Sequence, residues 1–157
     1  MNETRVSTTD RITISFEHRE QIVNWKDKGF FEGTDTNQMA TIALAIGVGN
    51  PTDFTNKSAY IRRDTLDTYD QSIYQAVNIG NNYEKDSDLN ILTDWINTVD
   101  YCNKCINTGL DKINQDIIQK YAGNKTRIND SDKENICLDL LDKLSDLYEK
   151  NIELNLD

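Results

Sequence analysis

The stretch RITISFEHREQIVNWKDKGFFEGTDTNQMATIALAIGVG, residues 11–49, carries most of what the sequence says about the fold. From Arg11 to Phe16 polar and apolar residues alternate, which is the two-residue period of a β-strand. The period then changes to that of an amphipathic helix over Glu17–Lys28. The sequence therefore predicts a short strand, Arg11–Ser15, that leads directly into a helix.

A second and far more apolar helix is expected from Asp35 to Val48. Asp35 and Gln38 have the spacing of a capping box, in which each side chain bonds the backbone amide of the other residue. The helix that follows has almost no polar face, and such a helix is normally buried on all sides. We therefore expect it to be the central helix of the protein.

The remaining two thirds of the chain read mainly as helices. Residues 50–63 are expected to be irregular, and a third helix is expected over about Thr65–Ile79. A long helix is predicted after Asp86 and Asp88, with Gly109 as a kink or a break within it. Residues 122–129 are expected to form a loop.

A last amphipathic helix is predicted to begin at a second capping box, formed by Ser131 and Glu134. Its apolar face would consist of Cys137, Leu140, Leu141, Leu144, Leu147 and Tyr148. The predicted fold is mainly α, a compact bundle of five or six helices with one short N-terminal β-strand. We expect residues 1–10 to be a flexible tail and residues 11–157 to be a single helical domain.

The charge of the chain is unevenly distributed along its length. The formal net charge is −10, but residues 1–63 hold eight Lys or Arg and eight Asp or Glu. The whole negative charge therefore lies in residues 64–157, which would repel the phosphates of nucleic acid. Any contact with DNA should come from the N-terminal third. The alternative interpretation is that the acidic surface only keeps the protein in solution.

The sequence favours a cytoplasmic location. No apolar segment near the N-terminus resembles a signal peptide, and the longest apolar run, Met39–Gly49, is about half of a membrane span. The three cysteines are an odd number, which favours reduced thiols. Cys102 and Cys105 form a CxxC pair, but a structural zinc site needs four ligands. We therefore interpret both as small core residues and expect no metal.

No pattern in the chain predicts catalysis. The single histidine, His18, falls in the first turn of a polar helix and is expected to be exposed. Two carboxylate series at helical spacing are expected to be solvated faces rather than cation sites; they are Asp64, Asp67 and Asp70, and Asp139, Asp142 and Asp146. Phosphate-binding loops, nucleophile elbows, zinc-protease motifs and dinucleotide fingerprints are absent. The chain is therefore expected not to be an enzyme and to need no cofactor.

Residues 11–49 resemble the ribbon–helix–helix group of dimeric DNA-binding regulators and antitoxins. In that group a strand pairs with its dimer mate and its polar face enters the major groove. The resemblance implies that Arg11, Thr13 and Ser15 contact bases. Independently of the resemblance, Arg62 and Arg63 are the densest basic point of the chain. With Arg11, Arg19, Lys26 and Lys28 they could line a side that contacts phosphates; the alternative is ordinary surface charge interleaved with acidic residues.

The segments RITISFEHREQIVNWK, GFFEGTD and MATIALAIGVGNP also resemble small accessory proteins of bacterial DNA-phosphorothioation (Dnd) systems, including DndE-like proteins. Those proteins begin with a strand, an amphipathic helix, a phenylalanine-bearing loop and an apolar helix that ends in glycine. They also have a later helix that ends in a turn with asparagine and glycine, which Asn107-Thr108-Gly109-Leu110 resembles. The resemblance therefore covers residues 11–113. It implies a non-catalytic component of a DNA-modification or defence locus that works through contacts with protein or nicked DNA.

The leading functional hypothesis is a non-enzymatic accessory or regulatory protein of a prokaryotic DNA-modification or defence system, with a protein partner. The alternatives are a ribbon–helix–helix regulator or antitoxin whose acidic C-terminal half binds a partner, and an acidic inhibitor that mimics DNA. The strand at Arg11–Ser15 has no obvious partner in the chain, and an unpaired strand leaves backbone groups unsatisfied. We therefore expect a homodimer or higher oligomer.

Overall fold

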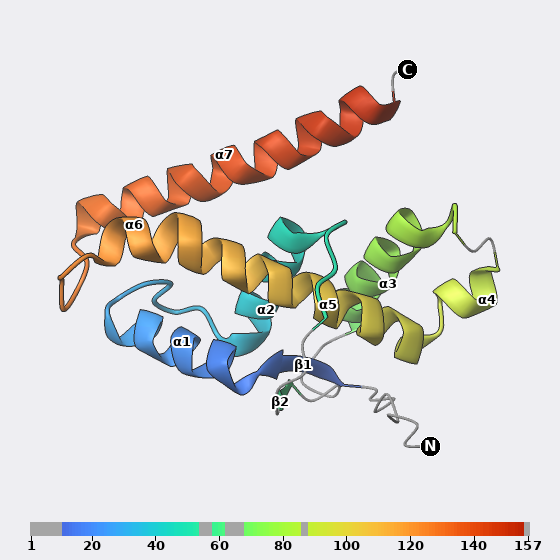
Figure 1. The fold of residues 1–157 in the computed structure, drawn as a ribbon, viewed down its shortest axis with the longest axis horizontal. Coiled ribbons are helices and arrows are strands. Elements are labelled where there is room, and N and C mark those ends of the chain that lie inside the picture. Colours follow the sequence, from blue (N-terminus) through green and yellow to red (C-terminus); the bar gives the residue numbers. More distant parts are fainter. Residues whose placement is uncertain (1–10, 54–57, 62–67, 86–87, 156–157) are drawn as a thin grey trace.

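A computed structural model describes residues 11–53, 58–61, 68–85 and 88–155 of the protein, and its fold is mainly α, as the sequence predicts. The elements follow in the order β1 (Ile12–Ser15), α1 (Phe16–Asp27), α2 (Thr36–Gly47), β2 (Ser58–Ile61), α3 (Thr68–Asn82), α4 (Leu89–Leu92), α5 (Trp95–Ile113), a π-helical turn (Asn114–Ile118), α6 (Gln119–Ala122) and α7 (Asp130–Asn155). Figure 1 shows α5 and α6 as one continuous rod through the middle of the molecule.

Helix α2 packs against α5 at the centre of the protein. Its start is the predicted capping box of Asp35 and Gln38, which is confirmed. The two helices touch through their backbones, because a Cβ built on Gly47 would lie 1.9 Å from the carbonyl oxygen of Cys105. The side chains of Met39, Ala43 and other α2 residues are buried there. The prediction that this helix is central and buried is therefore confirmed.

Strand β1 pairs with β2 in an antiparallel two-stranded sheet. The register places Ile12 opposite Ile61 and Ser15 opposite Ser58. The expectation of a lone strand, with only irregular structure over residues 50–63, is therefore wrong. The strand finds its partner about 45 residues further along the same chain, so its edge gives no reason to expect a dimer.

The long helix differs from its prediction in two places. It begins at Trp95 rather than near Asp88, because the short α4 precedes it and Asp94 caps the new helix through the amide of Asn97. Gly109 neither kinks nor breaks the helix, which continues past it to Ile113. The glycine is needed for a different reason, its close contact with α2.

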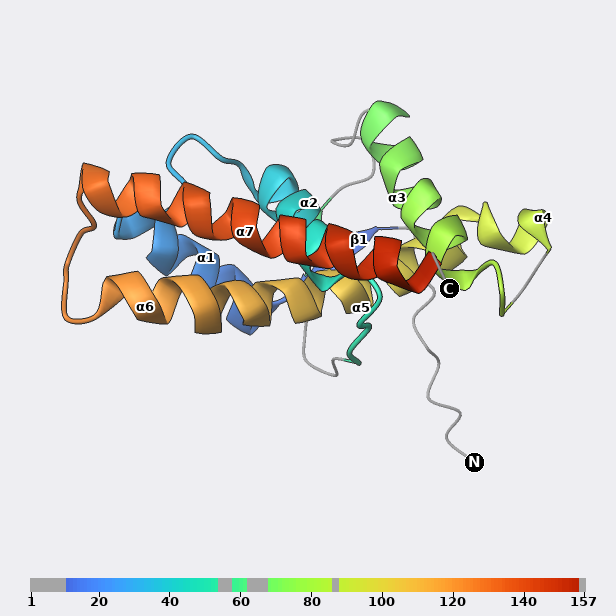
Figure 2. The same cartoon turned by 90° about the horizontal axis from the view of Figure 1, so that it is seen from above.

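Helix α7 lies along one side of the α5–α6 rod and diverges from it toward the C-terminus (Figure 1). Seen from above, it passes over α1 and α2 (Figure 2). Within the part of the chain that the structure describes, none of the helices combines the length and the apolar character needed to cross a membrane.

Candidate protein-binding surface

The residues expected to read DNA are not arranged for that role. Thr13 and Ser15 are only 5% and 4% exposed, and the other two residues of β1 are buried as well. The backbone amide of Thr13 donates to Oδ1 of Asn103 at 2.9 Å, and the hydroxyl of Ser15 accepts from the amide of His18. Arg11 alone is exposed. The interpretation of Thr13 and Ser15 as base readers is therefore wrong for this fold, since neither side chain can reach a groove.

Several other predicted positions cannot be placed. Arg62 and Arg63, together with Asp64 and Asp67, lie outside the described residues, and so does the side chain of Asp70. Across the described ranges, no group of three or more His, Cys, Asp or Glu side chains is placed to hold a metal ion.

His18 is buried, so the expectation of an exposed residue is wrong. Its Nε2 lies 2.7 Å from Oδ1 of Asp111, which is about half exposed at the surface of α5. Its Nδ1 is enclosed and has no hydrogen-bond partner among the described atoms. A general base needs a nitrogen that can reach a substrate. Because the outer nitrogen is bonded and the inner one is enclosed, this pair links α1 to α5 rather than forming an open site.

The CxxC pair is part of the core. Cys102 and Cys105 are both fully buried, as predicted, whereas Cys137 on α7 is exposed. Burial raises the pKa of the Cys105 thiol, and it raises that of Cys102 strongly. A thiol reacts as its thiolate, so both buried cysteines are poor nucleophiles at neutral pH.

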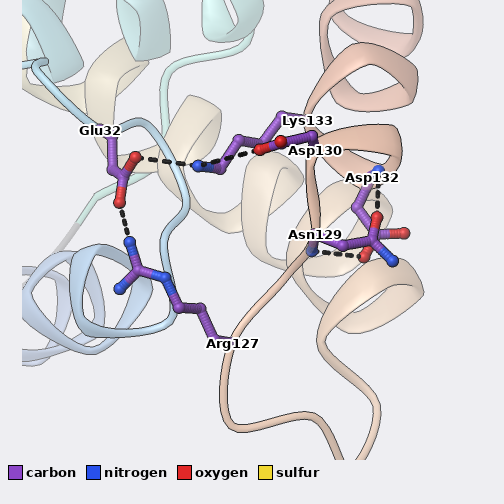
Figure 3. Close-up of polar contacts among 6 residues, drawn as sticks. All are labelled: Glu32, Arg127, Asn129, Asp130, Asp132 and Lys133. Atoms are coloured by element: carbon purple, nitrogen blue, oxygen red, sulfur yellow. Dashed lines mark hydrogen bonds and ion pairs between the residues drawn. The ribbon is translucent and has the colours of Figure 1, made fainter.

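The start of α7 is held by a group of polar contacts (Figure 3). Glu32, in the loop between α1 and α2, accepts from Lys133 at 2.9 Å and forms an ion pair with Arg127. Asn129 and Asp132 bond each other's backbone amides at 3.1 and 2.8 Å. The helix is therefore capped two residues before the predicted Ser131–Glu134 box, which is a correction.

The inner side of α7 packs on the bundle. Ile136 is buried in the core cluster, and Leu140 is partly buried against it. Asp139 accepts from Lys120 and Tyr121 of α6, which lowers the pKa of its carboxyl. Lys143 bonds Asp116 of the π-helical turn. Asp139 is thus an anchor of α7 and not the solvated residue that its spacing suggested.

The outer side of α7 carries an exposed apolar stripe. Leu138, Leu141 and Leu144 are 58%, 61% and 38% exposed. Residues three apart are neighbours on a helix surface, so the three side chains form one continuous row, which we call the leucine stripe. Single exposed leucines are ordinary, but three in a continuous row on one side of a helix indicate an interaction surface.

The apolar arc of α7 is wider than the surface beneath it. At 100° per residue, the arc from Ile136 round to Leu138 spans roughly 200°, about twice that of an ordinary surface helix. The bundle covers the half that holds Ile136 and Leu140, and the half with the leucine stripe stays open. The sequence prediction places Leu140, Leu141 and Leu144 on a single apolar face and does not separate the two halves. The width of this arc in the sequence could have indicated that α7 has more apolar surface than one packing face can cover.

Carboxylates border the leucine stripe on the side away from Leu140. Asp142, Asp146 and Glu149 are exposed, and we call them the acidic rim. Among the described residues, these three side chains form no ion pair or hydrogen bond. Lys133, in contrast, is paired with Glu32, and Lys143 with Asp116. Lys133 and Lys143, the two lysines of α7 with described side chains, thus pair with the bundle, and the open surface combines apolar and negative character.

A second group of exposed apolar side chains lies on α4 and the start of α5, at the end of the molecule away from the start of α7 (Figure 1). It consists of Leu89, Ile91 and Ile96. This group borders residues 86–87, which lie outside the described residues, so α7 is the better defined surface.

Comparison with known proteins finds nothing similar to this chain: no family model, no curated protein and no solved structure matches it.

Proposed function

We propose that this protein is non-enzymatic and acts by binding another protein through α7, as an accessory or regulatory component. The observation that carries the proposal is the leucine stripe, which lies open on a helix whose opposite side packs on the bundle through Ile136 and Leu140. Contact between a row of leucine side chains and water is unfavourable, and burial of the row against a partner would be favourable. The enclosed Nδ1 of His18 and the buried thiols of α5 agree with a role in binding rather than in chemistry.

The setting that we propose is a prokaryotic DNA-modification or defence system. The support is the resemblance of residues 11–113 to Dnd accessory proteins, which act without catalysis. A ribbon–helix–helix regulator is not proposed, because β1 pairs with β2 and its polar side chains are buried. A DNA mimic would present carboxylates as phosphate substitutes, and an open leucine stripe between them would not serve that purpose.

The test is recovery of partners from the organism that makes the protein. The tagged full-length chain, its Leu141→Glu variant and its Val23→Glu variant are purified from those cells and compared by quantitative mass spectrometry. Leu141 and Val23 are similarly exposed, at 61% and 54%, but Val23 lies on α1, so the second variant controls for the added charge. We expect a stoichiometric partner that the wild type and Val23→Glu retain and Leu141→Glu loses. Recovery of no partner, or of one that Leu141→Glu retains equally, contradicts the proposal.

A further inference from the structure

We infer that the partner presents a basic amphipathic helix, which docks along the leucine stripe with its positive side chains against the acidic rim. This inference rests on the proposed function and specifies the chemistry of the partner.

The spacing of the stripe fits a helix. Leu138, Leu141 and Leu144 make a straight ridge about two turns long on the open side of α7. Helices pack ridge into groove at interaxial distances of about 8–10 Å. At that distance the positions that flank the ridge lie opposite the flanking positions of the partner, which is how charges select the partner of a paired helix.

The charges at those flanking positions select a basic partner. On the helical wheel Asp142 and Glu149 lie about 80–100° from Leu141, at the edge of the stripe, and Asp146 lies just beyond them. These three carboxylates are exposed, and Lys133 and Lys143 are bound to carboxylates of the bundle. An apolar helix with lysine or arginine at its flanks would satisfy both parts of this surface.

The same charges oppose a second copy of this chain. Helix α7 holds eight Asp or Glu and three Lys between Asp130 and Asn155. An antiparallel two-fold pair would place the acidic rim of one copy against that of the other, and like charges in this arrangement are unfavourable. In either direction the pairing brings together two helices of the same net charge.

The experiment uses a synthetic helical peptide of about 21 residues as the probe, with leucine on one face and lysine on the others. A matched peptide has glutamate in place of every lysine. Binding to the full-length chain is measured by fluorescence anisotropy at about 150 mM salt. Cys137, exposed one residue before Leu138, gives a second readout, because a docked helix slows its reaction with a thiol reagent.

We expect micromolar binding of the lysine peptide, weakened about tenfold or more by Leu141→Glu and by the pair Asp142→Lys and Asp146→Lys. The matched controls on α1 are Val23→Glu and the pair Glu20→Lys and Asp27→Lys, all at exposed positions. These controls should change the affinity by less than about twofold. Because the substituted side chains are exposed, circular dichroism should show an unchanged fold for every variant.

Three outcomes overturn the inference. The first is equal binding of the glutamate peptide, and the second is equal weakening by the controls on α1. The third is a complex of twice the 18.0 kDa chain mass that Leu141→Glu dissociates, since a second copy would then cover the stripe. A native partner lost by Leu141→Glu, together with no binding of the lysine peptide, rejects the basic helix and leaves the proposed function standing. No native partner in the purification rejects the proposed function itself.

Discussion

Gly109 of α5 lies directly against Ala43 of α2: a Cβ built on Gly109 would be 1.8 Å from the carbonyl oxygen of Ala43 and 2.8 Å from its Cα. No side chain larger than hydrogen fits there unless the two central helices separate. The backbone contact explains why a glycine is placed within a continuous helix, where it otherwise costs about 1 kcal/mol relative to alanine.

Replacing Gly109 by alanine should therefore destabilise the protein by about 3 kcal/mol or more, because the added methyl group meets backbone atoms that cannot rotate away. Gly80 of α3 is the matched control, since nothing lies within 4 Å of the Cβ that it would gain. Gly80→Ala should stabilise the protein by about 0.5–1 kcal/mol. Urea denaturation measures both changes, and a similar response of the two variants would contradict the close contact.

The three thiols should differ sharply in reactivity. In the native protein we expect Ellman's reagent to modify Cys137 within minutes and to leave Cys102 and Cys105 unmodified, because burial encloses them and raises the pKa of both thiols. In concentrated guanidinium all three should react. Modification of two or three thiols in the folded protein would show that the reagent reaches Cys102 or Cys105 and that the core around them opens.

Replacing Cys102 and Cys105 together by alanine should lower the free energy of unfolding by about 1–3 kcal/mol, because each substitution leaves a small cavity in the core. Chelators should change neither the stability nor the spectrum of the wild type. Stoichiometric zinc in the purified protein, lost in the double variant, would instead assign the pair a metal.

The stability of the protein should fall in acid through the carboxylates that hold α7. Hydrogen bonds from Lys133, Lys125 and Tyr121 are the first causes that lower the pKa values of Glu32, Asp132 and Asp139, respectively, below their ordinary values. A group whose pKa is lower in the folded state stabilises fully above its unfolded pKa, and this contribution is lost as the pH falls through the folded pKa. The urea midpoint should therefore be constant above about pH 5 and decrease progressively as the pH falls below it.

Glu32→Gln should flatten part of this acid dependence, because the glutamine cannot be protonated and no longer forms ion pairs with Lys133 and Arg127. Glu20→Gln on α1 is the control, an exposed residue beside none of these contacts. Equal pH profiles for wild type and Glu32→Gln would show that the Glu32 contacts do not stabilise the fold.

The isolated protein should not bind DNA tightly at about 150 mM salt, because residues 1–63 are balanced in charge and the remainder is acidic. Arg11→Ala should have little effect, since Thr13 and Ser15 beside it are buried. Anisotropy titration with duplex DNA measures this. Nanomolar affinity for one particular DNA sequence would contradict this expectation and also the proposed function.

The local parts of this fold could be predicted from the sequence. The capping box at Asp35 and Gln38, the change from strand to helix at Phe16 and the uniformly apolar α2 all depend on residues within about four positions of one another. Contacts at that range depend on few distant residues, although the box predicted at Ser131 and Glu134 is replaced by a cap at Asn129 and Asp132. The mainly α class follows from the helical periodicity along the chain, and the burial of the CxxC pair is predicted because two small thiols without further ligands suit a helix core.

The tertiary structure alone decided which faces stay open. His18 is buried where its Nε2 meets Asp111, 93 residues away. One edge of β1 pairs with β2, and Asn103 of α5 accepts from the amide of Thr13. In α7 the sequence places apolar residues on the side that is buried and also on the side that stays exposed. Only the position of α7 on the bundle buries Ile136 and leaves Leu141 exposed, because the bundle is wide enough to cover one side of the helix and not the other.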